Sequence, residues 1–191
     1  MIQLKKVDIN DKICWRLGGL IVNRFKPTYK IDKVSDIPFE LLERDNIKGI
    51  MFDVDNTLTT MGKGITKDNE KWIKEAKELG YNICLVSNTL NIKKVKKIMN
   101  DLEVNGLYFA RKPGTTGIAK ALEIMSLKKE EVILVGDQLF TDIWGANRFG
   151  IKSILVNPIS KKEGPATLIK RPLERWVLRK IEKEVKKGEN K

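Results

Sequence analysis

Residues 47–60 read IKGIMFDVDNTLTT, and the order of residue types in this stretch decides the fold. The apolar run Ile50–Phe52 predicts a buried strand that ends directly before Asp53, and Asp55 follows after one apolar residue. Two ionised carboxylates at the end of a buried strand repel one another and lose hydration. A divalent cation would offset that cost, whereas the alternative is an ordinary turn in which Asp and Asn cap the next segment.

Short apolar runs alternate with amphipathic stretches along the rest of this region. The predicted strands are Ile47–Phe52, Tyr81–Val86, Leu107–Ala110, Glu131–Val135 and Ser153–Val156. The predicted helices are Thr66–Leu79, a segment around residues 92–99, Ile118–Met125 and Asp142–Phe149. Strands that alternate with helices indicate right-handed βαβ units. The expected fold class is therefore α/β, with a parallel sheet flanked by helices.

Polar side chains follow four of these five strands, at the point where each strand ends. In chain order they are Asp53, Asp55, Asn56 and Thr57, then Ser87 and Asn88, then Lys112, then Asp137 and Asp142. Ligands of open parallel sheets bind beyond the carboxyl ends of the strands, so we expect these side chains at one edge. Each alone also fits a helix cap or a turn. Their shared placement indicates a phosphate or metal site.

The motifs occur in an order that resembles a known family. D-x-D-N-T at 53–57, a strand ending in Ser87, Lys112-Pro113 and G-D-x-x-x-x-D at 136–142 resemble subclass III of the haloacid dehalogenase (HAD) superfamily of aspartyl-phosphate phosphatases. The forms D-x-D-N-T and G-D-Q-x-x-T-D, with K-P-x-Y near the N-terminus, are most similar to the phosphatidylglycerophosphate phosphatases of bacteria and mitochondria. The resemblance implies a Rossmann-like HAD fold over residues 47–157.

The resemblance also implies catalytic roles. Asp53 is expected to attack phosphorus as the nucleophile, and Asp55 to protonate the leaving oxygen and then activate water. Lys112 is expected to neutralise both the phosphate and Asp53. The other expected phosphate ligands are Asn56, Thr57, Ser87 and Asn88.

A Mg²⁺ ion is the expected cofactor, because an all-oxygen site of carboxylates, a carbonyl, waters and phosphate suits it. The expected metal residues are Asp53, Asp137, Asp55 through its backbone carbonyl, and Asp142, either directly or through water.

Composition narrows the possible chemistry. The chain has no histidine, which excludes phosphohistidine intermediates, Ser-His-Asp and Cys-His catalysis, and His-ligated zinc. The two cysteines, Cys14 and Cys84, have neither metal nor disulfide spacing, and no apolar run reaches the length of a transmembrane helix. We therefore expect a cytoplasmic protein.

The net charge of +12 suggests an anionic partner, with a solvated Lys/Glu surface as the alternative. Residues 161–191 contribute eleven Lys and Arg against five Glu to this charge.

The intervals between motifs bear on the substrate. Neither Thr57 to Ser87 nor Ser87 to Lys112 is long enough for a separate cap domain. An open site suits a bulky phosphorylated substrate, and the expected one is phosphatidylglycerophosphate. The alternatives are a nucleic-acid end phosphatase, which the basic tail would equally suit, a phosphatase of a small ester capped by another subunit, and a non-catalytic basic adaptor.

The segments outside the core favour a membrane partner. We expect a partly helical N-terminal segment at residues 1–46, a phosphatase core at 47–160 and a basic amphipathic helix at 161–191. The helix has apolar residues along one side, namely Leu173, Trp176, Val177, Ile181 and Val185. Such a helix suits the anionic inner face of the cell membrane, as does the apolar segment 13–25. The alternative is that both segments pack on the sheet.

Overall fold

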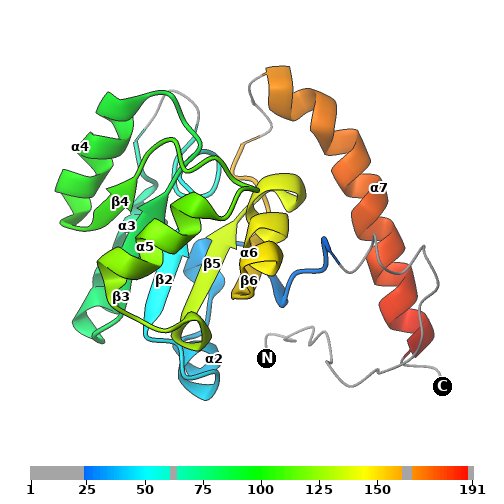
Figure 1. Ribbon diagram of the computed structural model, residues 1–191, viewed down its shortest axis with the longest axis horizontal. Helices are drawn as coiled ribbons and strands as arrows, with labels where there is room; N and C mark the ends of the chain where they lie inside the picture. The colour runs from blue at the N-terminus through cyan, green and yellow to red at the C-terminus, as the bar shows by residue number, and fades with distance from the viewer. Residues whose placement is uncertain (1–23, 61–63, 161–164, 189–191) are drawn as a thin grey trace.

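The structure, a computed structural model, describes residues 24–60, 64–160 and 165–188. Six parallel strands form one sheet in the order β1-β6-β5-β2-β3-β4 (Figure 1). They are β1 (Tyr29–Ile31), β2 (Gly49–Phe52), β3 (Asn82–Val86), β4 (Asn105–Leu107), β5 (Val132–Gly136) and β6 (Lys152–Val156). The predicted α/β class with a parallel sheet is confirmed.

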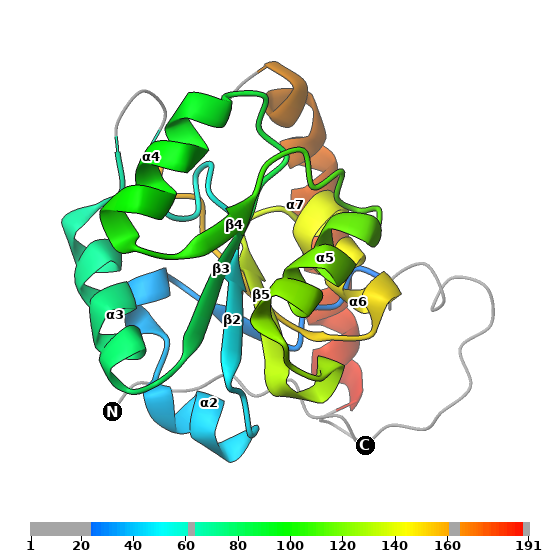
Figure 2. The same ribbon diagram turned by 60° about the vertical axis from the view of Figure 1, so that its left-hand side comes forward.

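Helices cover both faces of the sheet, so the central strands are buried throughout. Side chains of β2 alternate between two cores: Ile50 and Phe52 pack on one face and Met51 on the other. The first face is covered by η1 (Val34–Asp36), α2 (Phe39–Arg44), α3 (Lys67–Glu78) and α4 (Ile92–Leu102). The second is covered by α5 (Thr116–Met125) and α6 (Trp144–Phe149), as Figure 2 shows.

The helix boundaries follow recognisable signals. The Thr66 hydroxyl accepts a hydrogen bond from the Asn69 amide and begins α3. Past the other end of α3, Gly80 has φ +87°, a conformation that glycine adopts without strain. These are the boundaries that the sequence predicts to within one or two residues.

Three predictions differ from the structure. The third strand is Asn105–Leu107 and not Leu107–Ala110, because residues 108–110 leave the sheet and the Ala110 amide bonds to the Ser87 carbonyl. The helix expected at Asp142–Phe149 begins earlier, with the π-turn η3 (Leu139–Ile143). The edge strand β1 was not predicted, since three residues around an exposed lysine give little apolar periodicity. The helix α2 lies in the segment expected to be partly helical, but its bounds were not predicted.

No cap domain is present among the described residues of the two intervals between motifs. After Thr57 the chain makes short bridges at Thr59 and then enters α3. After Ser87 it forms α4, β4 and a loop that leads to Lys112. Nothing in this part of the chain covers the carboxyl edge as a separate folded unit.

The C-terminal helix α7 (Pro165–Gly188) runs beside α6 and β6 at one end of the molecule (Figure 1). Val177 and Ile181 are buried against Leu139, Ile143 and Leu155. For these two residues the alternative of packing on the domain holds, and the expected contact with a membrane does not. Residues 13–23 of the predicted N-terminal apolar segment lie outside the described residues. No helix in the described ranges is long and apolar enough to cross a bilayer.

Candidate active site

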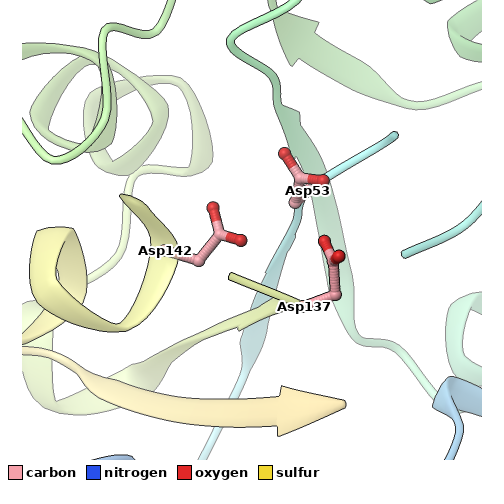
Figure 3. Close-up of side chains that lie close together, drawn as sticks. All are labelled: Asp53, Asp137 and Asp142. Atoms are coloured by element: carbon pink, nitrogen blue, oxygen red, sulfur yellow. The ribbon is translucent and has the colours of Figure 1, made fainter. Parts of the chain in front are cut away.

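Three carboxylates lie together beyond the carboxyl ends of β2 and β5. Asp53 follows β2, Asp137 follows β5, and Asp142 lies in η3. One oxygen from each lies within 4.8 Å of the others, and Figure 3 shows the three side chains around a common point. All three are buried. The sequence predicted that this edge of the sheet would bring them together.

Gly136 makes the approach of Asp142 possible. A Cβ atom at this position would lie 2.4 Å from Cγ of Asp142, closer than real contacts allow. The Asp142 carboxylate also accepts a hydrogen bond from the Gln138 amide at 3.1 Å. The glycine and the π-turn together therefore fix Asp142 against the end of β5.

Lys112 lies between two of the acids. Its Nζ is 2.8 Å from Oδ1 of Asp53 and 2.7 Å from Oδ1 of Asp142, and its side chain is fully buried. Asn88 holds the backbone of Lys112 from both sides, because its Nδ2 donates to the Lys112 carbonyl and its Oδ1 accepts from the Lys112 amide, each at 2.8 Å. Asn88, expected to contact phosphate, thus positions the lysine.

Burial controls the protonation of these groups. It raises the pKa of Asp53 to about 7, although Lys112 lowers it. It also raises the pKa of Asp137 to about 8, with repulsion from Asp53 and Asp142 adding to the effect and Arg171 opposing it. Burial alone would lower the pKa of Lys112, but the carboxylates of Asp142 and Asp53 outweigh it and raise that pKa above its usual range.

Asp137 is held by side chains from two distant parts of the chain, Thr57 and Arg171. The Thr57 hydroxyl donates to its Oδ1 at 3.0 Å. Arg171 of α7 donates to its backbone carbonyl at 2.7 Å and pairs with its Oδ2. Arg171 is also 3.0 Å from Glu174, which in turn accepts a hydrogen bond from the Phe140 amide. The sequence did not predict Arg171, because only the docking of α7 brings it to this edge.

The charges of the site fit a divalent cation. Its buried acids are Asp53, Asp137, Asp142 and Glu174, and its two cations in the described residues are Lys112 and Arg171. When all four acids are ionised, two of their negative charges have no balancing cation among the described residues. Oδ2 of Asp53 is buried and accepts no hydrogen bond within the described residues. Carboxylate oxygens are the ligands that Mg²⁺ prefers, so one such ion could replace two protons here.

Other predicted residues lie differently. The Asp55 side chain is about half exposed (47%) and 2.5 Å from Nζ of Lys94, so it is separate from the three gathered carboxylates. The Asn56 amide exchanges hydrogen bonds with the backbone of Ser160. The Ser87 hydroxyl is buried and accepts from the Thr89 amide at 3.2 Å. The expected contacts of Asn56, Thr57, Ser87, Asn88 and Lys112 with phosphate, and of the Asp55 carbonyl with metal, stay predictions.

Known proteins share this sequence pattern. The family model described as "Mitochondrial PGP phosphatase" matches residues 20–160. A Bacillus subtilis (strain 168) protein named "Probable phosphatase YqeG" is 37% identical over 155 residues, which cover 81% of this chain and 90% of that protein. Phosphatidylglycerophosphate phosphatase 1, chloroplastic/mitochondrial, of Arabidopsis thaliana is 30% identical over 173 residues, which cover 85% of this chain but 49% of that protein.

Solved structures share the fold. An uncharacterized protein from Listeria monocytogenes serotype 4b superposes with a TM-score of 0.51 at 20% identity, covering 62% of this chain and 85% of that one. The 3-deoxy-D-manno-octulosonate 8-phosphate phosphatase of Yersinia pestis gives 0.50 at 16% identity, covering 73% and 78%. The match of the family model over most of the chain, together with the two sequence relatives, confirms the expected resemblance. The chain is a phosphatase, and it belongs to the phosphatidylglycerophosphate (PGP) phosphatase family.

Proposed function

We propose that the chain is a Mg²⁺-dependent phosphomonoesterase that works through an aspartyl phosphate on Asp53. The observation that carries this proposal is Oδ2 of Asp53, a buried oxygen with no hydrogen-bond partner in the described residues, on a carboxylate whose other oxygen is held by Lys112. A carboxylate positioned in this way can act as a nucleophile.

The reaction would take place in two displacements at phosphorus. First, a carboxylate oxygen of Asp53 forms a bond to phosphorus while the ester P–O bond breaks, and Asp55 gives its proton to the leaving alcohol oxygen. Water then attacks phosphorus, Asp55 takes a proton from it, and the bond between phosphorus and Asp53 breaks to release inorganic phosphate. Asp55 lies two residues after Asp53 and is partly exposed, which suits a group that exchanges protons with water.

The remaining residues would bind charge. Mg²⁺ held by Asp53 and Asp137, with the Asp55 carbonyl and Asp142 nearby, would supply charge neutralisation at the phosphate. Lys112 and Ser87 would contact phosphate oxygens directly. Thr57 and Asn88 act mainly on Asp137 and Lys112, to which they are hydrogen-bonded.

The proposed substrate is phosphatidylglycerophosphate, which would be converted to phosphatidylglycerol. The family match and the Arabidopsis relative support this choice. The lack of a cap among the described residues also supports it, because a headgroup presented by a bilayer needs an open site. The proposed partner is therefore an anionic phospholipid at a membrane surface, with peripheral contact.

A phosphate-release screen tests the proposal. The purified protein with Mg²⁺ is offered phosphatidylglycerophosphate, oligonucleotides with 3′- or 5′-phosphates, and sugar phosphates. We expect the lipid to be hydrolysed at least about tenfold more efficiently than the others, a difference of about 1.4 kcal/mol in transition-state stabilisation. A preference for oligonucleotide ends would indicate that the substrate is nucleic acid and not the lipid. A preference for a sugar phosphate would contradict the argument from the open site.

A further inference from the structure

Exposed apolar side chains gather around the active-site edge of the sheet. Leu90 follows β3 and is 79% exposed, and Tyr108 and Phe109 follow β4 at 38% and 44%. At the opposite edge, where α3 and α5 end, the exposed large apolar residues in the described part of the chain are Leu79 and Ile124. Exposed apolar side chains therefore occur at both edges of the sheet, and those at the opposite edge can serve as a control for those near the active site.

The two loops at this edge form one hydrogen-bonded unit. The Ser87 amide donates to the Leu107 carbonyl, and the Ala110 amide donates to the Ser87 carbonyl, each at 2.9 Å. Asn88 and Lys112 add their reciprocal pair of hydrogen bonds. The inner side of this unit thus carries Lys112 to Asp53, while its outer side presents exposed residues to solvent.

The outer side is apolar and basic. It consists of Leu90, Tyr108, Phe109 and Arg111, which we name the β3–β4 rim; the Tyr108 and Phe109 rings pack edge to face with centroids 5.7 Å apart. Helix α4 begins two residues after Leu90 and has no acidic residue in its first turn. Its exposed lysines are Lys93, Lys96 and Lys97.

The backbone of the rim is in an unfavourable conformation. Phe109 and Arg111 both have φ of +54°, in the left-handed region that bulky residues rarely adopt. Backbone conformations of this kind cost stability and concentrate at ligand-contacting sites. The Phe109 ring next to this backbone is 44% exposed.

We infer that the β3–β4 rim is the surface by which the protein docks on an anionic lipid bilayer. The inference rests on the proposed function, since it supplies the face that meets the substrate's membrane. Apolar side chains flanked by Lys and Arg are suited to the boundary between headgroups and acyl chains. Because Lys112 lies on the inner side of the same loops, docking would bring a headgroup phosphate towards Asp53 without removing the lipid from the bilayer.

Vesicle sedimentation with matched variants tests this inference. The rim variant is Leu90→Ser with Phe109→Asn, since asparagine tolerates a positive φ better than most residues. The control variant, Leu79→Ser with Ile124→Ser, removes a similar apolar area from the opposite edge. We expect the rim variant to lose at least about tenfold in affinity for vesicles of phosphatidylglycerol and phosphatidylcholine, and the control variant to bind like the unmodified protein. Melting curves establish that both variants are folded.

The other outcomes would overturn the inference. If the two variants bind vesicles equally well, the rim does not dock on the membrane. If light scattering shows a dimer only with the intact rim, the rim is a self-association surface instead. The proposed function is tested separately. Strong rim-dependent binding without hydrolysis of phosphatidylglycerophosphate would support the docking surface and contradict the proposed substrate. Hydrolysis of this lipid with binding that does not depend on the rim would support the substrate and contradict the docking surface.

Discussion

The side chains around Asp53 place a buried carboxylate beside a buried lysine in a phosphatase chain that has no histidine. Lys112 is fully buried between Asp53 and Asp142, and its positive charge offsets part of the cost of burying these two carboxylates. Asp53 and Asp137 nevertheless have raised pKa values, of about 7 and about 8, because burial dominates. A divalent cation would favour their ionised forms, so metal binding and proton release should be linked.

This linkage predicts an unusual pH dependence of stability. The ordinary pKa of an Asp is 3.8, so between about pH 4 and pH 8 the unfolded chain releases protons that folded, metal-free protein keeps at Asp53 and Asp137. The chelated protein should therefore become less stable as pH rises across this window. Mg²⁺ at about 100 times its dissociation constant should add about 2.7 kcal/mol, which raises the melting temperature by roughly 5 to 10 °C for a chain of this size.

Melting curves with chelator or with Mg²⁺, recorded near both ends of that window, measure the effect. The effect of Mg²⁺ should be larger at the alkaline end, where the metal no longer competes with protons. The Asp53→Asn variant serves as control and should show a flatter pH slope when chelated. A chelated protein whose stability rises towards the alkaline end would contradict the raised pKa values.

At the scale of the elements, α7 joins a distant part of the chain to the site. Val177 and Ile181 dock the helix on the domain, and Arg171 reaches Asp137 and Glu174 from the same helix. Arg171 opposes the rise in the pKa of Asp137, so it favours the carboxylate form that a metal needs. Its own positive charge repels a metal ion at every pH. Near neutral pH the gain from ionising Asp137 is expected to outweigh this repulsion, whereas at alkaline pH that gain is gone.

The Arg171→Ala variant should therefore bind Mn²⁺, as a probe for Mg²⁺, more weakly near neutral pH, with the loss disappearing at alkaline pH. Arg171→Lys should recover part of the affinity because it keeps the charge. Arg175→Ala, which changes an exposed arginine one turn further along α7, is the matched control. Calorimetric titration at two pH values measures the effect. A loss of affinity that is the same at both pH values would indicate a purely structural contact instead.

The elements also show what sequence patterns can and cannot predict. Long apolar runs such as those of β2 and β5 predict buried parallel strands, and the carboxyl-end rule then places Asp53 beside Asp137 and Asp142. The boundary of β4 was misplaced because residues 108–110 are apolar enough for a strand. They leave the sheet, and the Ala110 amide donates a hydrogen bond to the Ser87 carbonyl. Arg171 could not be predicted, since its position depends on how α7 packs and not on any local motif.

At the scale of the whole molecule, charge and exposure divide the surface. The β3–β4 rim and the first turn of α4 lie at the same carboxyl edge of the sheet as Asp53, while the buried side of α7 adds to the core. The exposed Leu173 and Trp176 follow Arg171 on α7 and offer a second apolar contact near the same end. In the proposed docking, the edge of the sheet that carries Asp53, Asp137 and Asp142 would face the anionic surface.

The central claim is that Asp53 carries the phosphoryl group, and trapping that group tests it most directly. The protein is mixed with phosphatidylglycerophosphate and Mg²⁺, quenched in acid during turnover, digested and analysed by mass spectrometry. We predict one phosphoryl group on Asp53 of the unmodified protein and none in the Asp53→Asn variant, which should be folded and inactive. Continued turnover by Asp53→Asn, or a phosphoryl group on any other residue, would contradict the account.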